Sequence, residues 1–180
     1  MPLTLTANGI TSGAGTTMLN SSGTPLQFLQ STYSTVTEVT GNRTEYDMPG
    51  VLGNGSFSIT PTNSSTKFLF QFVLSQGQED TWRHQAYRFY YKVGAGGSWI
   101  NINGTTGYSW IQGSSGHLTT HRNQVLFNHN TTSTVYFKVT GNNHGNGDTL
   151  HLNQNNTTND TGNNNTCQTS SSLSVWEFSA

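Results

Sequence analysis

The side chains that could carry out acid–base or nucleophilic chemistry are few in this chain, and they are scattered along it. A glycosidase needs two carboxyl groups at a set separation, and no such pair is recognisable among the eight carboxylates Glu38, Glu45, Asp47, Glu79, Asp80, Asp148, Asp160 and Glu177. The nucleophile elbow, the phosphate-binding loop, the dinucleotide fingerprint and the zinc-protease motif do not occur. The sequence therefore predicts no catalytic residue and no enzyme, while a small glycoside hydrolase or lyase stays open as a third hypothesis.

Two histidine spacings could suit a metal ion. His117 and His121 stand four residues apart, but that spacing brings two rings to one face only on a helix, and the intervening residues are Leu, Thr and Thr. His144 and Asp148 could share a loop, although the two glycines between them are more typical of a turn. We predict no metal site and no cofactor, with metal binding left open.

Aromatic residues in polar, glycine-rich segments give a stronger lead. Their neighbours are Gly, Ser and Asn, and aromatic rings beside such groups can bind sugars by stacking and hydrogen bonding, or build protein interfaces. The candidate ligand-binding residues are Trp82, Trp99, Tyr108 and Trp110. A place in the core near the strand ends would explain them equally well.

The composition excludes several classes of partner. Only 8% of the residues are charged, against about 25% in a typical globular domain, and the seven basic residues are scattered, so we expect no nucleic-acid partner. No segment approaches the roughly 20 apolar residues of a membrane span, and the start lacks the pattern of a secretory signal, so we expect synthesis in a host cytoplasm and no membrane insertion. Cys167 is the single cysteine and cannot form an internal disulfide. A surface of hydroxyls and amides suits an extracellular, salty or virion setting.

Short strand-like segments separated by turn residues predict the fold. Convincing helical periodicity is missing, and β-branched and aromatic runs recur at intervals of roughly 8–14 residues. The expected strands span 26–40, 55–61, 67–75, 84–93, 97–104, 107–113, 122–130, 133–141, 148–154 and 172–178. This spacing is typical of an all-β antiparallel sandwich of the jelly-roll kind. We expect an extended N-terminal arm over residues 1–25 and a jelly-roll domain over residues 26–180, with an Asn-rich loop before the last strand.

The last expected strand has two apolar sides. Leu173 and Val175 face one side, while Trp176 and Phe178 face the other, because side chains alternate along a strand. Chain ends are usually loose and polar, so we expect this strand to lie inside a sheet. A strand with two dry faces needs a second covering surface, and a subunit interface would supply one.

Three segments carry a resemblance to a known group of proteins. GTPLQ at 23–27, SITPTNSSTK at 58–67 and SLSVWEF at 172–178 resemble small structural, decoration or fibre-tip proteins of tailed bacteriophages of marine bacteria and cyanobacteria. The middle of the chain and the Asn-rich 141–166 depart from that pattern. The resemblance implies a jelly roll like that of tumour necrosis factor, assembled as a trimer with its first and last strands together near the threefold axis. It implies no shared catalytic residue.

These observations lead to one main hypothesis. The chain is expected to be a non-enzymatic virion surface protein, a homotrimeric capsid decoration or cement protein that contacts the capsid or another virion protein through its arm. The candidate trimer interface comprises Phe68, Phe70, Phe72, Trp176 and Phe178. A tail-fibre or spike tip that binds a host receptor or a host-surface glycan, and a stand-alone lectin, remain alternatives; the absence of shaft repeats favours decoration.

Overall fold

The chain is built almost entirely of strands. The computed structural model describes residues 3–6, 9–12, 23–42, 44–78, 84–102, 109–112, 118–143, 146–154 and 169–180. Besides one short 3-10 turn, η1 (Gly50–Leu52), the elements are β1 (Leu3–Thr6), β2 (Gly9–Ser12), β3 (Pro25–Tyr33), β4 (Thr37–Asn42), β5 (Tyr46–Asp47), β6 (Phe57–Ile59), β7 (Lys67–Gln78), β8 (His84–Val93), β9 (Ile100–Asn101), β10 (Ser109–Gln112), β11 (Thr119–Asn128), β12 (Val135–Asn143), β13 (Asn146–Leu152) and β14 (Ser171–Phe178). No helix in these ranges is long and apolar enough to cross a membrane.

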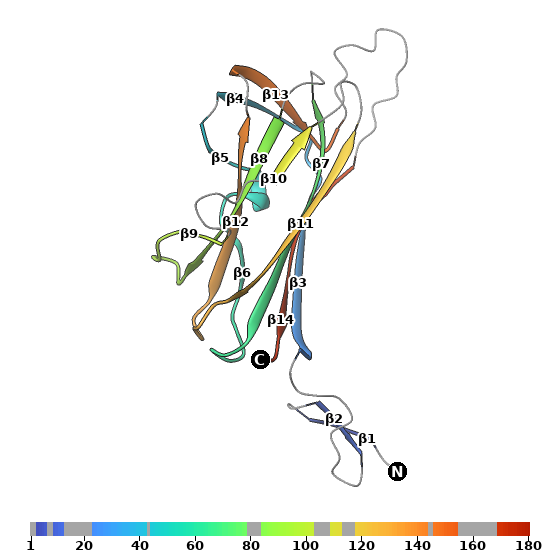
Figure 1. Cartoon of the computed structure of the whole chain (residues 1–180), viewed down its shortest axis with the longest axis vertical. Coiled ribbons are helices and arrows are strands. Elements are labelled where there is room, and N and C mark those ends of the chain that lie inside the picture. Colours follow the sequence, from blue (N-terminus) through green and yellow to red (C-terminus); the bar gives the residue numbers. More distant parts are fainter. Residues whose placement is uncertain are drawn as a thin grey trace.

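Eight strands pair in a nested order. The first pairs with the last (β3 with β14), and inside that pair lie β6 with β12, β7 with β11, and β8 with β10, all antiparallel. Two further pairings, β14 with β7 and β12 with β8, join these pairs into the sheets β3-β14-β7-β11 and β6-β12-β8-β10. A long hairpin wrapped into two sheets in this way is a jelly roll, so the predicted all-β sandwich is confirmed (Figure 1).

Short strands extend the two sheets beyond the nested pairs. β13 pairs with the same edge of β7 as β14 does, farther along β7, and its other edge pairs with β4. β5 lies beyond β6 on β12, and β9 pairs with β8 near its C-terminal end. The single strand predicted over 26–40 is two strands in the structure, β3 and β4, which are separated by residues 34–36.

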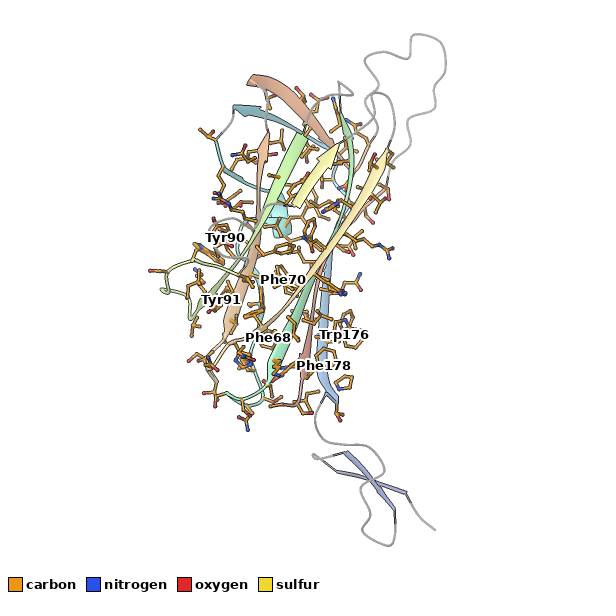
Figure 2. The ribbon with its side chains drawn as sticks, viewed as in Figure 1. Phe68, Phe70, Tyr90, Tyr91, Trp176 and Phe178 are labelled. Atoms are coloured by element: carbon orange, nitrogen blue, oxygen red, sulfur yellow. The ribbon has the colours of Figure 1, made fainter. Side chains whose placement is uncertain are left out.

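The core between the sheets is a row of aromatic rings. Phe68, Phe70 and Phe72 of β7 are fully buried, and Figure 2 shows Phe68 and Phe70 between the two sheets. They contact Phe137 of β12 and Phe89 of β8, with Phe70–Phe137 and Phe72–Phe89 centroid distances of 4.7 Å each. The assignment of these three phenylalanines to a trimer interface is thereby corrected, because side chains closed inside one protomer have no surface left for another copy.

The terminal strand lies inside a sheet, as its two apolar sides predicted. β14 is hydrogen-bonded to β3 on one edge and to β7 on the other. Leu173 and Val175 are fully buried in the core, whereas Trp176 and Phe178 are half-buried on the opposite face, pointing away from the second sheet (Figure 2). Both predictions about this strand are confirmed.

The expected arm contains two short strands in the described ranges. β1 and β2 pair with each other and form a sheet separate from the sandwich, and β3 begins at Pro25. The division of the chain at residue 25 remains a prediction. Most of the Asn-rich loop before β14 lies outside the described residues.

We expect Phe70→Ala to destabilise the protein strongly. The ring is fully buried between the sheets, and truncating such a side chain typically costs about 3–5 kcal/mol through lost burial and the cavity left behind. Urea unfolding at fixed protein concentration measures this, with Thr132→Ala in the exposed turn between β11 and β12 as the control, expected within about 0.5 kcal/mol of wild type. A loss below about 1 kcal/mol for Phe70→Ala would show that this ring is not central to the core.

Candidate functional site

Only part of the predicted ligand-binding set can be placed. Trp99 lies in the segment between β8 and β9 and is half-buried. Trp110 is in β10, where the backbone is described and the side chain is not, while Trp82 and Tyr108 lie outside the described residues. The candidate ligand site is therefore built around Trp99.

Tyrosines and lysines alternate beneath Trp99 on the outer face of β8 and β12. The inward residues of β8, Tyr87 and Phe89, are buried in the core, so the intervening residues face outward. The register places Tyr90 opposite Lys138, and Lys92 opposite Tyr136. Each tyrosine therefore faces a lysine on the neighbouring strand.

Trp99 lies against this Tyr/Lys face. The ammonium groups of Lys92 and Lys138 are each 5.0 Å from the centroid of the indole, within the range of a cation–π contact. Gly55, at φ +72°, packs against the indole so closely that a Cβ there would lie 2.7 Å from a ring carbon. The lysines and this glycine fix the position of the indole on the sheet.

A carboxylate network borders the same face. Glu45 accepts hydrogen bonds from Thr140 Oγ1 (2.6 Å), from the Tyr90 hydroxyl (2.7 Å) and from Arg88. Burial raises the pKa of Glu45, but these hydrogen bonds and the Arg88 charge outweigh it and hold the pKa below its ordinary value. Glu45 is therefore ionised and fully engaged at neutral pH.

A hollow of about 390 Å³ opens between Trp99 and this network. Its lining comes from β5 and the residue before it, from β8 and β12, and from the segment before β9. It consists of Glu45, Tyr46, Asp47, Tyr90, Trp99, Lys138 and Thr140. Lys138 Nζ is 2.5 Å from Asp47 Oδ1, and the Asp47 side chain is 57% exposed. Sequence reasoning found only Trp99, because the other members meet through a register between strands far apart in the chain.

The outer face of the other sheet is apolar along one line, and we call this line the apolar row. Its residues lie opposite one another across all four strands: Phe28 of β3, Trp176 of β14, Leu69 of β7 and Leu126 of β11. Phe28 and Leu126 are 46% and 59% exposed. The Phe28 and Trp176 rings stand 4.3 Å apart, and Phe178 extends the row at 6.4 Å from Trp176.

A parallel line of polar side chains runs beside the apolar row. Gln30, Ser174, Gln71 and Gln124 occupy the next level of the same strands. Gln71 Nε2 donates to Gln124 Oε1 at 2.6 Å, and Ser174 Oγ donates to Gln71 Oε1 at 3.4 Å. The outward residues described on these four strands include no carboxylate, and the basic residues Lys67 and Arg122 lie at the flanks. The face is thus apolar and amide-rich at its centre.

The buried carboxylate of Glu177 fixes the strand that carries Trp176. Glu177 is fully buried and accepts hydrogen bonds from the Thr62 backbone N–H (2.8 Å), the Thr62 hydroxyl (2.9 Å), the Thr66 hydroxyl and Gln27. Burial raises its pKa, but these donors outweigh burial and hold the pKa below its ordinary value. The carboxylate therefore ties β14 to β3 and to the β6–β7 connection.

The histidines weighed as possible metal ligands receive no support for that role from the described residues. His117 and His144 lie outside them, and His121 of β11 packs its ring against Phe72, with centroids 5.4 Å apart. Within the described part of the chain, no three His, Cys, Asp or Glu residues are grouped as a metal site would require.

Comparisons with known proteins give structural matches only. The sequence matches no family model and no curated protein. The structure is similar to the VP2 subviral particle of infectious bursal disease virus (10% identity, TM-score 0.44), to the Gx strain of that virus (12%, 0.42) and to its T=1 particles (9%, 0.43). The matches cover 90–91% of this chain but 38–40% of those chains, so this chain spans less than half of their length.

We expect the Glu177 hydrogen bonds to make stability depend on pH. Because the pKa of Glu177 is lower in the folded protein than its ordinary 4.5, its contribution is present above about pH 4.5 and is lost as the pH falls through the folded-state pKa. Glu177→Gln should lower the free energy of unfolding by about 1–3 kcal/mol at pH 7, with the difference shrinking in acid.

Urea unfolding of both proteins from pH 7 to pH 3 measures this difference. Burial lowers the pKa of the nearby His129, whose ring bonds Thr66, while the charge of Glu177 acts in the opposite direction. The titration of His129 therefore differs between the two proteins, and both are compared in a His129→Gln background. Asp47→Asn, at an exposed carboxylate, is the control and should cost at most about 1 kcal/mol. An unchanged gap between wild type and Glu177→Gln down to pH 3 would contradict the assignment.

Proposed function

We propose that this chain is a non-enzymatic structural protein of a virus particle surface, and that it assembles as a homotrimer in a decoration or cement role. The resemblance of three sequence segments to phage decoration and fibre-tip proteins supports this, and so does the jelly-roll topology. Because one fold hosts many functions, the proposal rests mainly on the surface of the molecule.

The apolar row is the observation that carries the proposal. Contiguous apolar surface crossing a whole sheet marks an interaction site more often than a free surface. A large aromatic pair, Phe28 and Trp176, lies within it, and aromatic residues are enriched where interfaces are energetically important. Among the described outward residues of these four strands, the charges are Lys67 and Arg122 at the flanks, as in an interface with an apolar centre and a polar rim.

A second copy of the chain is the occupant that best fits this face. Since the described outward residues include no carboxylate, two such faces meeting would bury no unpaired acidic group. Of the predicted interface residues, Trp176 and Phe178 keep this role, and Phe28, Leu69 and Leu126 join them. The number of copies, three, is taken from the resemblance to the phage proteins.

The arm supplies the proposed contact with the particle. The backbone N–H of Gly23 donates to Ser179 O (3.0 Å), and the N–H of Ser179 donates to Thr24 O (2.9 Å). The chain therefore enters β3 beside the end of β14, at one end of the sandwich (Figure 1). A capsid or other virion protein bound through residues 1–25 would hold this end toward the particle.

We expect the purified protein to have a mass of about three times 19.6 kDa in light scattering after size exclusion. Trp176→Ala should dissociate it, because it removes the largest ring of the apolar row, and loss of a central interface aromatic typically costs about 2 kcal/mol or more of binding. Tyr136→Ala, on the opposite outer face, is the matched control and should remain trimeric. A wild-type monomer, or a Trp176→Ala protein that stays trimeric, would overturn the proposed interface.

We also expect the protein alone to remain as discrete trimers at high concentration in negative-stain electron microscopy. A decoration protein binds a shell that other subunits build, whereas a shell-building protein closes on itself through several interfaces. Closed particles formed by this chain alone would replace the decoration role with a shell-forming one.

A further inference from the structure

We propose that the hollow beside Trp99, on the outer face of β8 and β12, is a binding site for a neutral saccharide. The inference goes beyond the proposed virion role and does not depend on the trimer, because it concerns the opposite face of the sandwich. Figure 2 shows Tyr90 on that face, on the other side of the molecule from Trp176.

The size and lining of the hollow suit a small sugar. About 390 Å³ falls in the range of small-molecule sites, and the lining combines aromatic rings with a few polar groups, which is the usual composition of such sites. Trp99 and Tyr90 supply aromatic rings to the lining, and both are only half-buried, so part of each ring is open to the C–H groups of a pyranose.

The indole is held in place before any ligand arrives. Lys92 and Lys138 lie 5.0 Å from its centroid, and Gly55 leaves space for its edge that a Cβ would fill. A ring fixed by its own sheet loses little conformational freedom on binding, which favours affinity for a weakly held ligand.

The polar groups around the hollow offer bonds to hydroxyls. Asp47 is exposed and has an acceptor oxygen beyond its contact with Lys138, and the Lys138 ammonium has three donors. Glu45 is already engaged by three donors, so its part is to hold the Tyr90 hydroxyl in place. Hydroxyl groups, which both donate and accept, match this mixture.

Charge balance points to a neutral ligand. Each carboxylate in the lining is paired with a cation, Glu45 with Arg88 and Asp47 with Lys138. Lys92 donates to Ala95 O at 2.7 Å and is not among the lining residues. The lining itself therefore offers no excess positive charge for a sialylated or sulfated sugar.

The same carboxylates argue for binding without cleavage. Glycoside hydrolysis needs a protonated carboxylic acid as well as a carboxylate. The pKa of Glu45 is held below its ordinary value by its hydrogen bonds, although burial acts the other way, and Asp47 is in contact with an ammonium group. Glu45 is therefore not placed to be a proton donor at neutral pH.

Saturation-transfer NMR and calorimetry on the full chain test the proposal. The probes are methyl glycosides of glucose, galactose, mannose and N-acetylglucosamine, with sialyllactose and a sulfated galactose as the charged comparison. We expect at least one neutral glycoside to bind with a Kd in the range of about 1–10 mM, and Trp99→Ala to weaken it about tenfold or more. Trp176→Ala, the same change on the other face, should bind as wild type does, whether or not it is trimeric.

A second variant keeps the test informative if Trp99→Ala does not fold. Asp47→Asn changes one exposed side chain and should weaken the neutral glycoside several-fold with an unchanged fold by circular dichroism. The proposal is overturned if no neutral glycoside binds, if only the charged sugars bind, or if a folded Trp99→Ala binds as wild type does. None of these outcomes bears on the mass measurement that tests the trimer.

Discussion

The contact between the rings of β7 and those of the facing sheet holds the molecule together. The chain is only 31% hydrophobic, so its apolar material has to be concentrated, and aromatic side chains bury about 150–250 Å² each. Phe68, Phe70 and Phe72 meet Phe137, Phe89 and Tyr87 across the gap at centroid distances of 4.7–5.9 Å. Because these aromatic contacts between the two sheets supply the core, the outer faces of the sheets can differ from each other.

The register of each strand decides which of its side chains reach the core and which reach the outer face. A shift of β14 by one residue would turn Trp176 into the core and Glu177 out of it, since side chains alternate. The donors from Thr62, Thr66 and Gln27 prevent this, because they satisfy the carboxylate only where it now lies. On the other sheet, the same alternation in β8 buries Tyr87 and Phe89 and leaves Tyr90 and Lys92 outward.

Local patterns in the sequence predicted the long strands, since turn residues and period-two alternation are visible without partners. They missed the short strands β1, β2 and β5, and the predicted strand 97–104 is only the two-residue β9. They predicted the two sides of β14 correctly. They placed Phe68, Phe70 and Phe72 at an interface, because β7 is apolar on both parities and alternation does not say which side faces the core. The Tyr/Lys face and the Glu45–Arg88 pair were not predicted, because they depend on pairing between strands far apart in the chain.

The two proposals are compatible because they use opposite faces of one sandwich. A trimer closed through the apolar row would cover β3, β14, β7 and β11 and leave the hollow beside Trp99 open on each protomer. Three linked weak sites bind a repetitive surface far more tightly than one does, by up to about 10²–10⁴-fold, if the spacing allows simultaneous contact. A millimolar site, too weak to act alone, is then sufficient on a trimer, and a particle carrying many trimers multiplies the effect. If both proposals hold, association through one sheet would make the weak site on the other sheet effective through multivalent binding.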